Sequence, residues 1–345
     1  MHKVSIVIVT YNSMKYLPDF LDSVFEQSYF KEKGLTPDVF IVDNASTDKT
    51  VKFIKDNFFT VHLLRNINNI GLCRAWNQAI KMTSGEYILI MNPDVILHQD
   101  YIKETVKILN FDQTIASVGG KLYRLKVSSW DGDNLLNLEK TNIIDSTGVQ
   151  AFKNRRFIER GAGETDHGQY NKEEQVFGIS GACVMHRRSA LEQIKFESEY
   201  FDNDFFMYQE DIDLACRLRL NGWLAIYTPK AIGYHHRRAR SQGKVSDWNI
   251  IRHRRQKESF VNFFSYRNHL LLLQKNSLKI NVFKHFPFIF FYELKKLLYV
   301  LILENSTFRR TIVDLIRLRK KIKQKRQFNM RLKKVKAQEI QQWFQ

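Results

Sequence analysis

The stretch KVSIVIVTYN, residues 3–12, decides the fold class that the sequence predicts. Its almost continuous apolar run is typical of a strand buried on both faces of a parallel sheet. The polar residues Thr10, Tyr11 and Asn12 follow directly, and the chain has no phosphate loop of the G-x-G-x-x-G or G-x-x-x-x-G-K-[ST] kind after this strand. The stretch therefore predicts an α/β protein and argues against a Rossmann dehydrogenase or a P-loop NTPase.

Strand and helix patterns alternate after this first strand. The predicted strands are 4–9, 39–42, 61–64 and 87–90, and the predicted helices are 16–27, 49–57 and 72–82. This alternation predicts a mostly parallel, Rossmann-like sheet flanked by helices, with right-handed crossovers. Ligands of such sheets bind at the carboxyl ends of the strands. Polar groups follow three of the strands, namely Thr10-Tyr11-Asn12, Asp43-Asn44 and Asn92-Pro93-Asp94, and we expect them to line one site.

Three carboxylates, Glu210, Asp211 and Asp213, stand within four residues at the first turn of a helix predicted over 211–221. Gly222 is the stop signal of this helix. One acid is enough to cap a helix. Crowded acids also shift one another's pKa values, which keeps a proton acceptor usable near neutral pH. The pattern alone leaves two interpretations open, a catalytic base and an over-capped surface helix.

Two further groups suit a metal and a diphosphate. Asn92-Pro93-Asp94 offers the oxygen ligands that Mg²⁺ prefers, although Asn-Pro is also an ordinary turn starter. His235-His236 follows a strand-like segment over 231–234, so an imidazole could reach the same mouth. The arginines that come next, at 237, 238 and 240, suit phosphate oxygens but are equally compatible with a solvated loop. From about 120 to 174 the chain is polar without clear periodicity, which predicts a loop-rich segment lining the site.

The net charge of +18 is concentrated near the end of the chain. Residues 309–336 hold 13 Lys and Arg and one acid, Asp314, which amounts to +12. Before them, the apolar and aromatic segment 286–303 is interrupted by charges at 293, 295 and 296, so it is a poor spanning helix. An amphipathic segment followed by a polybasic run suits the surface of an anionic membrane. The alternative is a helix packed on the main domain with a solvated basic end.

The cysteines and the first residues of the sequence indicate the compartment in which we expect the protein. Cys73, Cys183 and Cys216 lack metal-type spacing, which suits buried thiols in a reducing compartment. No signal-peptide pattern precedes the first strand. We therefore expect a cytoplasmic protein, with residues 1–250 as the catalytic domain and 251–345 as a helical, amphipathic and basic membrane-associating region.

The order of motifs over residues 3–275 resembles the family 2 inverting glycosyltransferases of the GT-A fold. The matching segments are 4–12, 42–48, 68–77, 91–95, 145–148, 160–164, 177–182 and 210–213. Met91-Asn92-Pro93-Asp94-Val95 is similar to the N-P-D-V form of the D-x-D motif that is typical of bacterial rhamnosyltransferases. The resemblance implies a GT-A sheet and a metal-dependent glycosyltransferase.

The resemblance also implies roles for individual residues. Asp211 would be the catalytic base. Asp94 and His235, less readily His236, would hold Mg²⁺ or Mn²⁺, although the neutral Asn92 in place of an acid implies low metal affinity. The residues expected to contact the nucleotide sugar are Thr10, Tyr11, Asn12, Asp43, Asn44, Asn69, Gly71, Arg74, Asn77, Asn92 and Asp94, with Asp43 reading the pyrimidine base. Those expected to position the acceptor are Glu210, Asp213, Trp223 and Arg237.

The expected reaction transfers L-rhamnose from dTDP-L-rhamnose, with inversion, to a hydroxyl of a lipid-linked or cell-surface polysaccharide precursor at the cytoplasmic face of a bacterial membrane. Such a single displacement needs charge neutralisation and a base but no protein nucleophile. A UDP-hexose or UDP-galactofuranose donor is the alternative within the same chemistry. A nucleic-acid-binding protein is a distant alternative, because the basic residues lie in one tail and no RNA or DNA motif is present. A catalytically inactive partner subunit is the third alternative.

Overall fold

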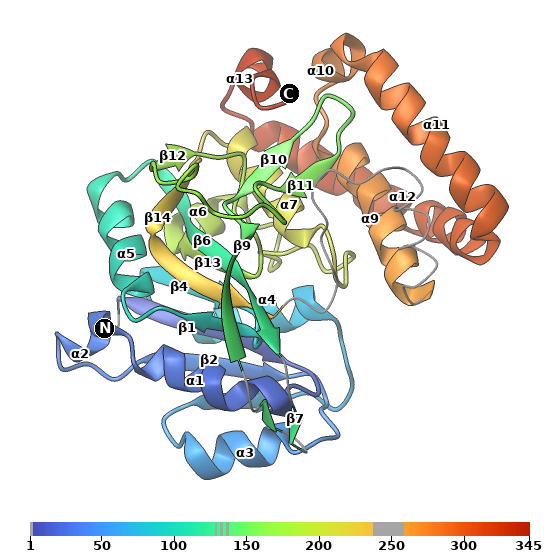
Figure 1. Ribbon diagram of the computed structural model, residues 1–345. Coiled ribbons are helices and arrows are strands. Elements are labelled where there is room, and N and C mark those ends of the chain that lie inside the picture. Colours follow the sequence, from blue (N-terminus) through green and yellow to red (C-terminus); the bar gives the residue numbers. More distant parts are fainter. Residues whose placement is uncertain (1–2, 128–129, 132–133, 136–137, 237–258) are drawn as a thin grey trace.

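The computed structural model describes residues 3–127, 130–131, 134–135, 138–236 and 259–345. Its core is a ten-stranded sheet that curls through the molecule, with strand order β12-β14-β6-β13-β4-β1-β2-β3 along its main path (Figure 1). The first half of the chain supplies β1 (Val4–Thr10), β2 (Asp38–Asp43), β3 (His62–Arg65) and β4 (Tyr87–Met91). These four strands are mutually parallel, as the alternation of strands and helices predicted.

Helices cover both faces of this sheet because its strands are apolar on both sides. On one face, Val7 and Ile90 share a hydrophobic cluster with Trp76 of α4. On the other face, Ile8 shares a second cluster with Phe20 of α1. The helices of this half are η1 (Met14–Tyr16), α1 (Leu17–Phe25), α2 (Ser28–Lys31), α3 (Thr50–Asn57), α4 (Leu72–Met82) and α5 (Tyr101–Phe111). The predicted strands and helices of this half are all present, with boundaries that differ by at most a few residues.

The segment from 120 to 174 differs from the loop-rich prediction, because it contains strands. They are β6 (Ile115–Val127), β7 (Trp130–Asp131), β8 (Asn134–Leu135), β9 (Leu138–Ser146), β10 (Val149–Ala151), β11 (Phe157–Glu159) and β12 (Glu174–Gln175). Strand β6 joins the central sheet between β14 and β13. The short strand β5 (Val95–Leu97) and the later elements β13 (Cys183–Arg187), α6 (Arg188–Ile194), α7 (Glu210–Leu220) and β14 (Leu224–His235) complete this half.

The C-terminal helices lie together on one side of the sheet (Figure 1). They are α9 (Ser259–Asn276), α10 (Lys279–Lys284), α11 (Phe286–Leu303), α12 (Asn305–Leu332) and α13 (Ala337–Gln341). The basic segment is therefore largely one helix, α12, which packs on α9 and α7, while most of its Lys and Arg side chains, Arg309, Arg310, Arg319 and Lys320 among them, are exposed. Its Lys325 is buried, and its ammonium group lies 2.7 Å from Glu199 and 2.9 Å from Asp204 and also contacts Asp202. Among the described residues, no helix is long and apolar enough to cross a membrane.

Candidate active site

A cleft of about 580 Å³ opens at the carboxyl ends of the parallel strands. Three chain segments from different strands meet there, namely those after β1, β2 and β4, together with the end of β14 and the start of α7. Its lining includes Tyr11, Asn44, Asn69, Gly71, Asn92, Asp94, Glu210, Asp211 and His235 from the residues that the sequence singled out. The topology thus brings together side chains more than 200 positions apart in the sequence.

Asp94 and His235 form a pair inside this cleft. Asp94 lies in the turn after β4, and His235 ends β14 opposite Val95. The Nε2 atom of His235 is 3.4 Å from Oδ1 of Asp94, while its Nδ1 is 2.8 Å from Oδ2 of the buried Asp145. Since a carboxylate can only accept, Nδ1 of His235 carries a proton and donates a hydrogen bond to Asp145, and the protonated ring directs its Nε2–H at Asp94. Burial lowers the pKa of His235, but the charge of Asp94 and the hydrogen bonds to Asp145 and Asp94 outweigh this and raise it to about 10.

The pair fits one end of a metal site. The Oδ1 atom of Asp94 is buried, and Nε2 of His235 lies 3.4 Å from it. Within the described ranges of the chain, no group of three His, Cys, Asp or Glu side chains is arranged to hold a metal ion by itself. A divalent ion that binds with a diphosphate needs only one or two protein ligands. Asp94 and His235 could supply them, with Asp145 orienting the imidazole as carboxylates do behind metal-binding histidines.

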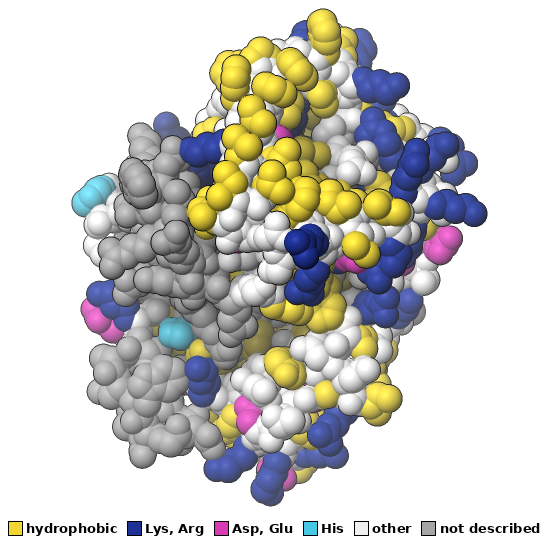
Figure 2. Space-filling model, turned by 90° about the vertical axis from the view of Figure 1, so that its right-hand side faces the viewer, with side chains coloured by type: hydrophobic (Ala, Val, Ile, Leu, Met, Phe, Trp, Pro, Cys, Tyr) yellow, Lys and Arg dark blue, Asp and Glu magenta, His cyan; other side chains and the backbone are white. Residues whose placement is uncertain are grey.

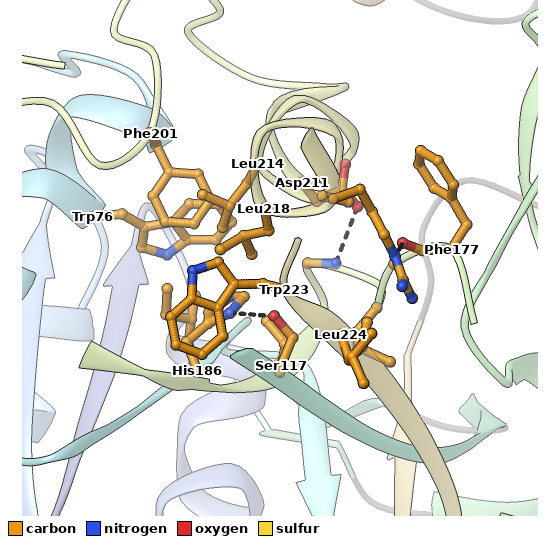
Figure 3. Close-up of a pocket in the computed structure, with 18 residues that line it drawn as sticks. Trp76, Ser117, Phe177, His186, Phe201, Asp211, Leu214, Leu218, Trp223 and Leu224 are labelled. Carbon is orange, nitrogen blue, oxygen red and sulfur yellow. Dashed lines mark hydrogen bonds between the residues drawn. The ribbon is translucent and has the colours of Figure 1, made fainter. Parts of the chain in front are cut away.

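Helix α7 carries Asp211 to the edge of the cleft. Figure 3 shows this carboxylate at the first turn of α7, joined by a dashed line to a backbone nitrogen. That nitrogen is the amide of Gly181, which donates to Oδ2 at 3.0 Å, while the amide of Ile212 donates to Oδ1 at 2.8 Å. A Cβ at position 181 would lie 3.1 Å from the Cβ of Asp211, so glycine permits this close approach. Two backbone amides therefore fix the orientation of the carboxylate.

The backbone immediately before α7 is strained. Phe206, Tyr208 and Gln209 all have φ values between 63° and 69°. Left-handed conformations are costly for residues with a Cβ and persist where the surrounding structure holds them. Here Asn268 of α9 donates to the carbonyl oxygens of Met207 and Tyr208 at 2.7 and 2.8 Å. Helix α9 therefore holds the segment that places the start of α7 in the cleft.

The three acids of α7 have different environments. Burial, followed by the charges of Asp211 and Asp213, raises the pKa of Glu210 to about 8. Burial opposes ionisation of Asp213, but Lys275 and Arg217 outweigh it and lower the pKa of Asp213. Asp213 lies 2.8 Å from the ammonium group of Lys275 and 3.0 Å from Nε of Arg217, so it faces the scaffold and does not line the cleft.

Two other expected acceptor contacts have different positions. Trp223 lines a smaller cavity beside α7, together with Trp76 and His186 (Figure 3). In the same cavity, His186 is hydrogen-bonded to Ser117 at 2.8 Å, and burial lowers its pKa to about 3, so it is neutral. Arg237 lies outside the described residues.

The side chains expected at the nucleotide divide into those that line the cleft and those that support its walls. Tyr11 is half exposed and lines the cleft. Asp43 is fully buried and accepts hydrogen bonds from Thr10 Oγ1 at 3.0 Å and from the amide of Ser46 at 2.9 Å. Asn12 accepts from the amide of Thr47 at 2.9 Å, which joins the loops after β1 and β2.

Asn77 and Arg74, both on α4, point to different places. Asn77 is buried, and its Oδ1 accepts hydrogen bonds from the backbone amides of Tyr200 and Phe201 at 3.0 and 2.9 Å. It therefore supports the chain that leads to α7. Arg74 lines a neighbouring cavity. His236 reaches Asp94 through its backbone amide, which donates to the Asp94 carbonyl at 2.8 Å.

Asp145 and Gly181 are the residues to which the sequence assigned no role. Both stand in motifs of the family resemblance, over 145–148 and 177–182. Asp145 is 90 positions before His235, and only the pairing of β9 with β6 and of β6 with β14 brings the two together. Their membership of those motifs was the only signal that could have identified them.

Comparisons with known proteins agree with this geometry. The model of the family "Glycosyl transferase family 2" matches residues 5–195, and that of "Glycosyl transferase family group 2" matches residues 144–319. An N-acetylglucosaminyl-diphospho-decaprenol L-rhamnosyltransferase of Mycobacterium tuberculosis is 28% identical over 74% of this chain and 83% of its own length. A dolichyl N-acetyl-α-D-glucosaminyl phosphate 3-β-D-2,3-diacetamido-2,3-dideoxy-β-D-glucuronosyltransferase of Methanococcus voltae is 25% identical over 69% of this chain and 68% of its own length.

Solved structures share the fold at low identity. GalNAc-T7 with UDP, GalNAc and Mn²⁺ has a TM-score of 0.56 and 13% identity over 80% of this chain, which spans 48% of that protein. Residues 1–349 of TarS from S. aureus have a TM-score of 0.51 and 14% identity over 96% of this chain and 88% of that one. The curled, mostly parallel sheet is that of the GT-A glycosyltransferases. Because the family model covers more than half of the chain, this protein belongs to glycosyl transferase family 2 and is a glycosyltransferase.

Proposed function

We propose that this chain is a metal-dependent, inverting glycosyltransferase that moves L-rhamnose from dTDP-L-rhamnose to a hydroxyl of a lipid-linked glycan precursor. The observation that carries the proposal is that Asp211 and the Asp94–His235 pair line one cleft. A carboxylate for the acceptor and a metal-type pair for the donor are the two requirements of this reaction. The M. tuberculosis relative is named for rhamnosyl transfer to a lipid diphosphate, which supports this donor and acceptor class.

Asp94 and His235 would hold Mg²⁺ or Mn²⁺, with Asn92 beside them. When bound, such an ion neutralises the charge that develops on the leaving diphosphate. The hydrogen bond from His235 to Asp145 keeps Nε2 directed at Asp94. Tyr11, Asn44, Asn69 and Gly71 line the same cleft and would contact the nucleotide sugar. The contact expected between Asp43 and the base stays a prediction.

Asp211 would act as the base in a single displacement. The acceptor hydroxyl oxygen forms a bond to the anomeric carbon, the bond from that carbon to the diphosphate oxygen breaks, and the diphosphate leaves with the electron pair. The hydroxyl proton passes to Asp211. The two amides that donate to its oxygens hold the carboxylate in a fixed orientation. Attack opposite the leaving group inverts the anomeric centre.

The C-terminal helices would rest on the cytoplasmic face of a bacterial membrane. On α11, Glu293 faces α9, where its carboxylate lies 2.6 Å from Nε2 of His269. The apolar side chains of α11 point outward instead, and they include Phe288, Phe291, Leu298 and Ile302. Of the charged residues of α11, Glu293 is turned inward and Lys295 is exposed, and a largely apolar exposed side that carries a cation suits an anionic membrane interface. The division into residues 1–250 and 251–345 stays a prediction.

Thermal unfolding in the presence of dTDP, UDP, GDP and ATP, each with and without Mg²⁺ or Mn²⁺, tests the donor. A ligand that binds only the folded state raises the unfolding midpoint by mass action. We expect a metal-dependent rise with dTDP. A larger rise with UDP would mean that the same reaction uses a UDP-sugar donor. No rise with any nucleotide would contradict the proposal.

Replacing Asp211 by Asn tests the base. The amide keeps the shape of the side chain but cannot accept the proton, so we expect transfer to fall by roughly 10²–10⁴-fold. The dTDP-induced rise in the unfolding midpoint should remain, because Asp94 and His235 are unchanged. Turnover close to that of the wild type would remove Asp211 from the role of base.

A further inference from the structure

A second cavity, of about 720 Å³, lies beside the active-site cleft. The two share Asn69 and Phe206 as lining residues, so they are separated by little more than the loop before α7. It is an open depression bordered by α4, α9 and α12, and Arg309, Arg310 and Arg317 on α12 are exposed. We name it the arginine cavity after its five lining arginines, which are Arg74, Arg267, Arg309, Arg310 and Arg317.

The charge of the arginine cavity is strongly positive. Among the described residues of its lining, two are acids, Asp204 and Asp314, and both already contact cations. Asp204 lies 2.9 Å from the ammonium group of Lys325, and Asp314 lies 2.7 Å from Arg267 and 2.8 Å from Arg317. The acids of the lining are therefore neutralised from within the protein.

Three of the arginines remain available for a ligand. Arg74, Arg309 and Arg310 have no carboxylate partner among the residues that the structure describes. Arg310 lies over the ring of Phe263 at 4.2 Å, which fixes its position without neutralising it. Guanidinium groups bind phosphate oxygens through paired hydrogen bonds, so this arrangement suits a phosphorylated ligand.

The arginine cavity also adjoins an exposed apolar surface. Val313 lines the cavity, and it is exposed together with Ile312 and Ile316 on the same helix. The exposed Ile302 near the end of α11 is joined to the first turns of α12, which carry Arg309 and Arg310, by the bend at Glu304. Figure 2 shows hydrophobic side chains gathered over the upper part of this face, with Lys and Arg side chains below and beside them and a hollow beneath. A ligand that combines phosphates with a hydrocarbon chain matches both surfaces.

We propose that the arginine cavity binds the diphosphate of a lipid-linked glycan acceptor, while its lipid lies on the exposed apolar residues of α11 and α12. This assignment rests on the proposed function and adds the site that recognises the acceptor. The first sugar after the diphosphate would have to pass over Asn69 and Phe206, which line both spaces, to reach the cleft. The donor diphosphate belongs to the other end of the cleft, because Asp94 and His235 line the cleft but not the arginine cavity.

Binding of farnesyl diphosphate in detergent, measured by calorimetry without metal or nucleotide, tests the assignment independently of catalysis. We expect the wild type to bind this probe more tightly than pyrophosphate or farnesol. The double variant R309Q/R310Q should weaken binding by about tenfold or more, because it removes two charge-assisted contacts. Displacement of the probe by dTDP, or equal binding of pyrophosphate, would contradict a site for the acceptor lipid.

The matched control is R319Q/K320Q, which removes the same charge from exposed positions of α12 outside the cavity. It should bind farnesyl diphosphate like the wild type. Equal weakening in both double variants would show general attraction by the basic helix and overturn the proposal. With a lipid-diphosphate acceptor, R309Q/R310Q should raise KM much more than with an alkyl glycoside that lacks phosphate. If dTDP stabilises the protein while farnesyl diphosphate does not bind, the proposed function stands and this inference fails.

Discussion

At the scale of single residues, the site depends on groups that orient the reacting side chains. Asp94 and Asp211 are recognisable in the sequence because they follow a strand and open a helix. Asp145 is not, because its contact with His235 depends on the register of three strands. Local pattern therefore identifies the side chains that would meet the substrate, and only the assembled sheet identifies the residue that orients one of them.

Asp145→Asn tests this supporting role. The amide can still contact Nδ1 of His235 but carries no charge, so it no longer favours the tautomer that leaves Nε2 for a metal. We expect the affinity for Mn²⁺ in the presence of dTDP to fall by about 10–100-fold, as for other residues behind metal ligands. This affinity is measured by titrating the protein with Mn²⁺ and following the electron paramagnetic resonance signal of the free ion. Unchanged affinity, with the variant folded, would limit Asp145 to a structural role.

Glu210 makes stability depend on pH. Its folded pKa of about 8 is above the ordinary value of 4.5, so between these values the folded state binds more protons than the unfolded state. The contribution to stability is therefore fully present below about pH 4.5 and is lost as pH rises through about 8. Glu210→Gln cannot ionise, so its unfolding midpoint should exceed that of the wild type increasingly from pH 5 to 8. An offset that is constant over this range would contradict the shifted pKa.

At the scale of elements, the C-terminal helices hold the catalytic helix in place. Lys275 of α9 contacts both Asp202, before α7, and Asp213, within it. Asn276 donates to Asp213 at 2.7 Å and accepts from Asn329 of α12 at 2.8 Å. The chain from α12 through α9 to α7 is thus continuous and buried. Removing one partner of a buried ion pair lowers the free energy of unfolding by more than the intact pair contributes to it, because the remaining charge stays desolvated.

Lys275→Met should therefore destabilise the protein strongly. It leaves the carboxylates of Asp202 and Asp213 with one partner fewer in a buried site, and we expect a loss of about 3 kcal/mol in the free energy of unfolding. Denaturant titration measures this loss. The control is Lys279→Met, at an exposed position on α10, which should change stability little. Equal effects of the two substitutions would refute a bracing role for Lys275.

The elements also differ in how well the sequence predicts them. Strands β1, β2 and β4 are buried along their whole length and β3 is a short edge strand, and all four are bounded by polar turns, so their pattern is plain. Strand β6 contains Gly119 and Gly120, which resemble a loop signal. A Cβ at position 120 would lie 1.9 Å from the carbonyl oxygen of Ala231, so glycine there reflects the close approach of β14. Tertiary contact determines this residue, and local propensity cannot show it.

At the scale of the whole molecule, the exposed apolar side of α11 and the mouth of the arginine cavity would meet the membrane together. Phe291→Glu with Ile302→Glu places two charges on this side, at side chains that are 68% and 72% exposed. We expect the variant to lose co-sedimentation with phosphatidylglycerol vesicles, because charge opposes insertion into the interface. Phe59→Glu with Phe111→Glu alters side chains that are 85% and 91% exposed elsewhere, and it should still sediment. Equal retention of both variants on vesicles would argue against this surface.

The buried ammonium group of Lys325 limits how this enzyme can be re-engineered. Its three carboxylate partners belong to the segment that leads into α7, so the C-terminal helices are not an exchangeable anchor. A chimera that grafts the final helices of another enzyme onto residues 1–250 would bury Glu199, Asp202 and Asp204 without Lys325. A chimera of two homologous chains would fold only where the new helix supplies a buried cation at the position of Lys325. Substitutions in the segment 199–204 and in α12 should therefore occur together.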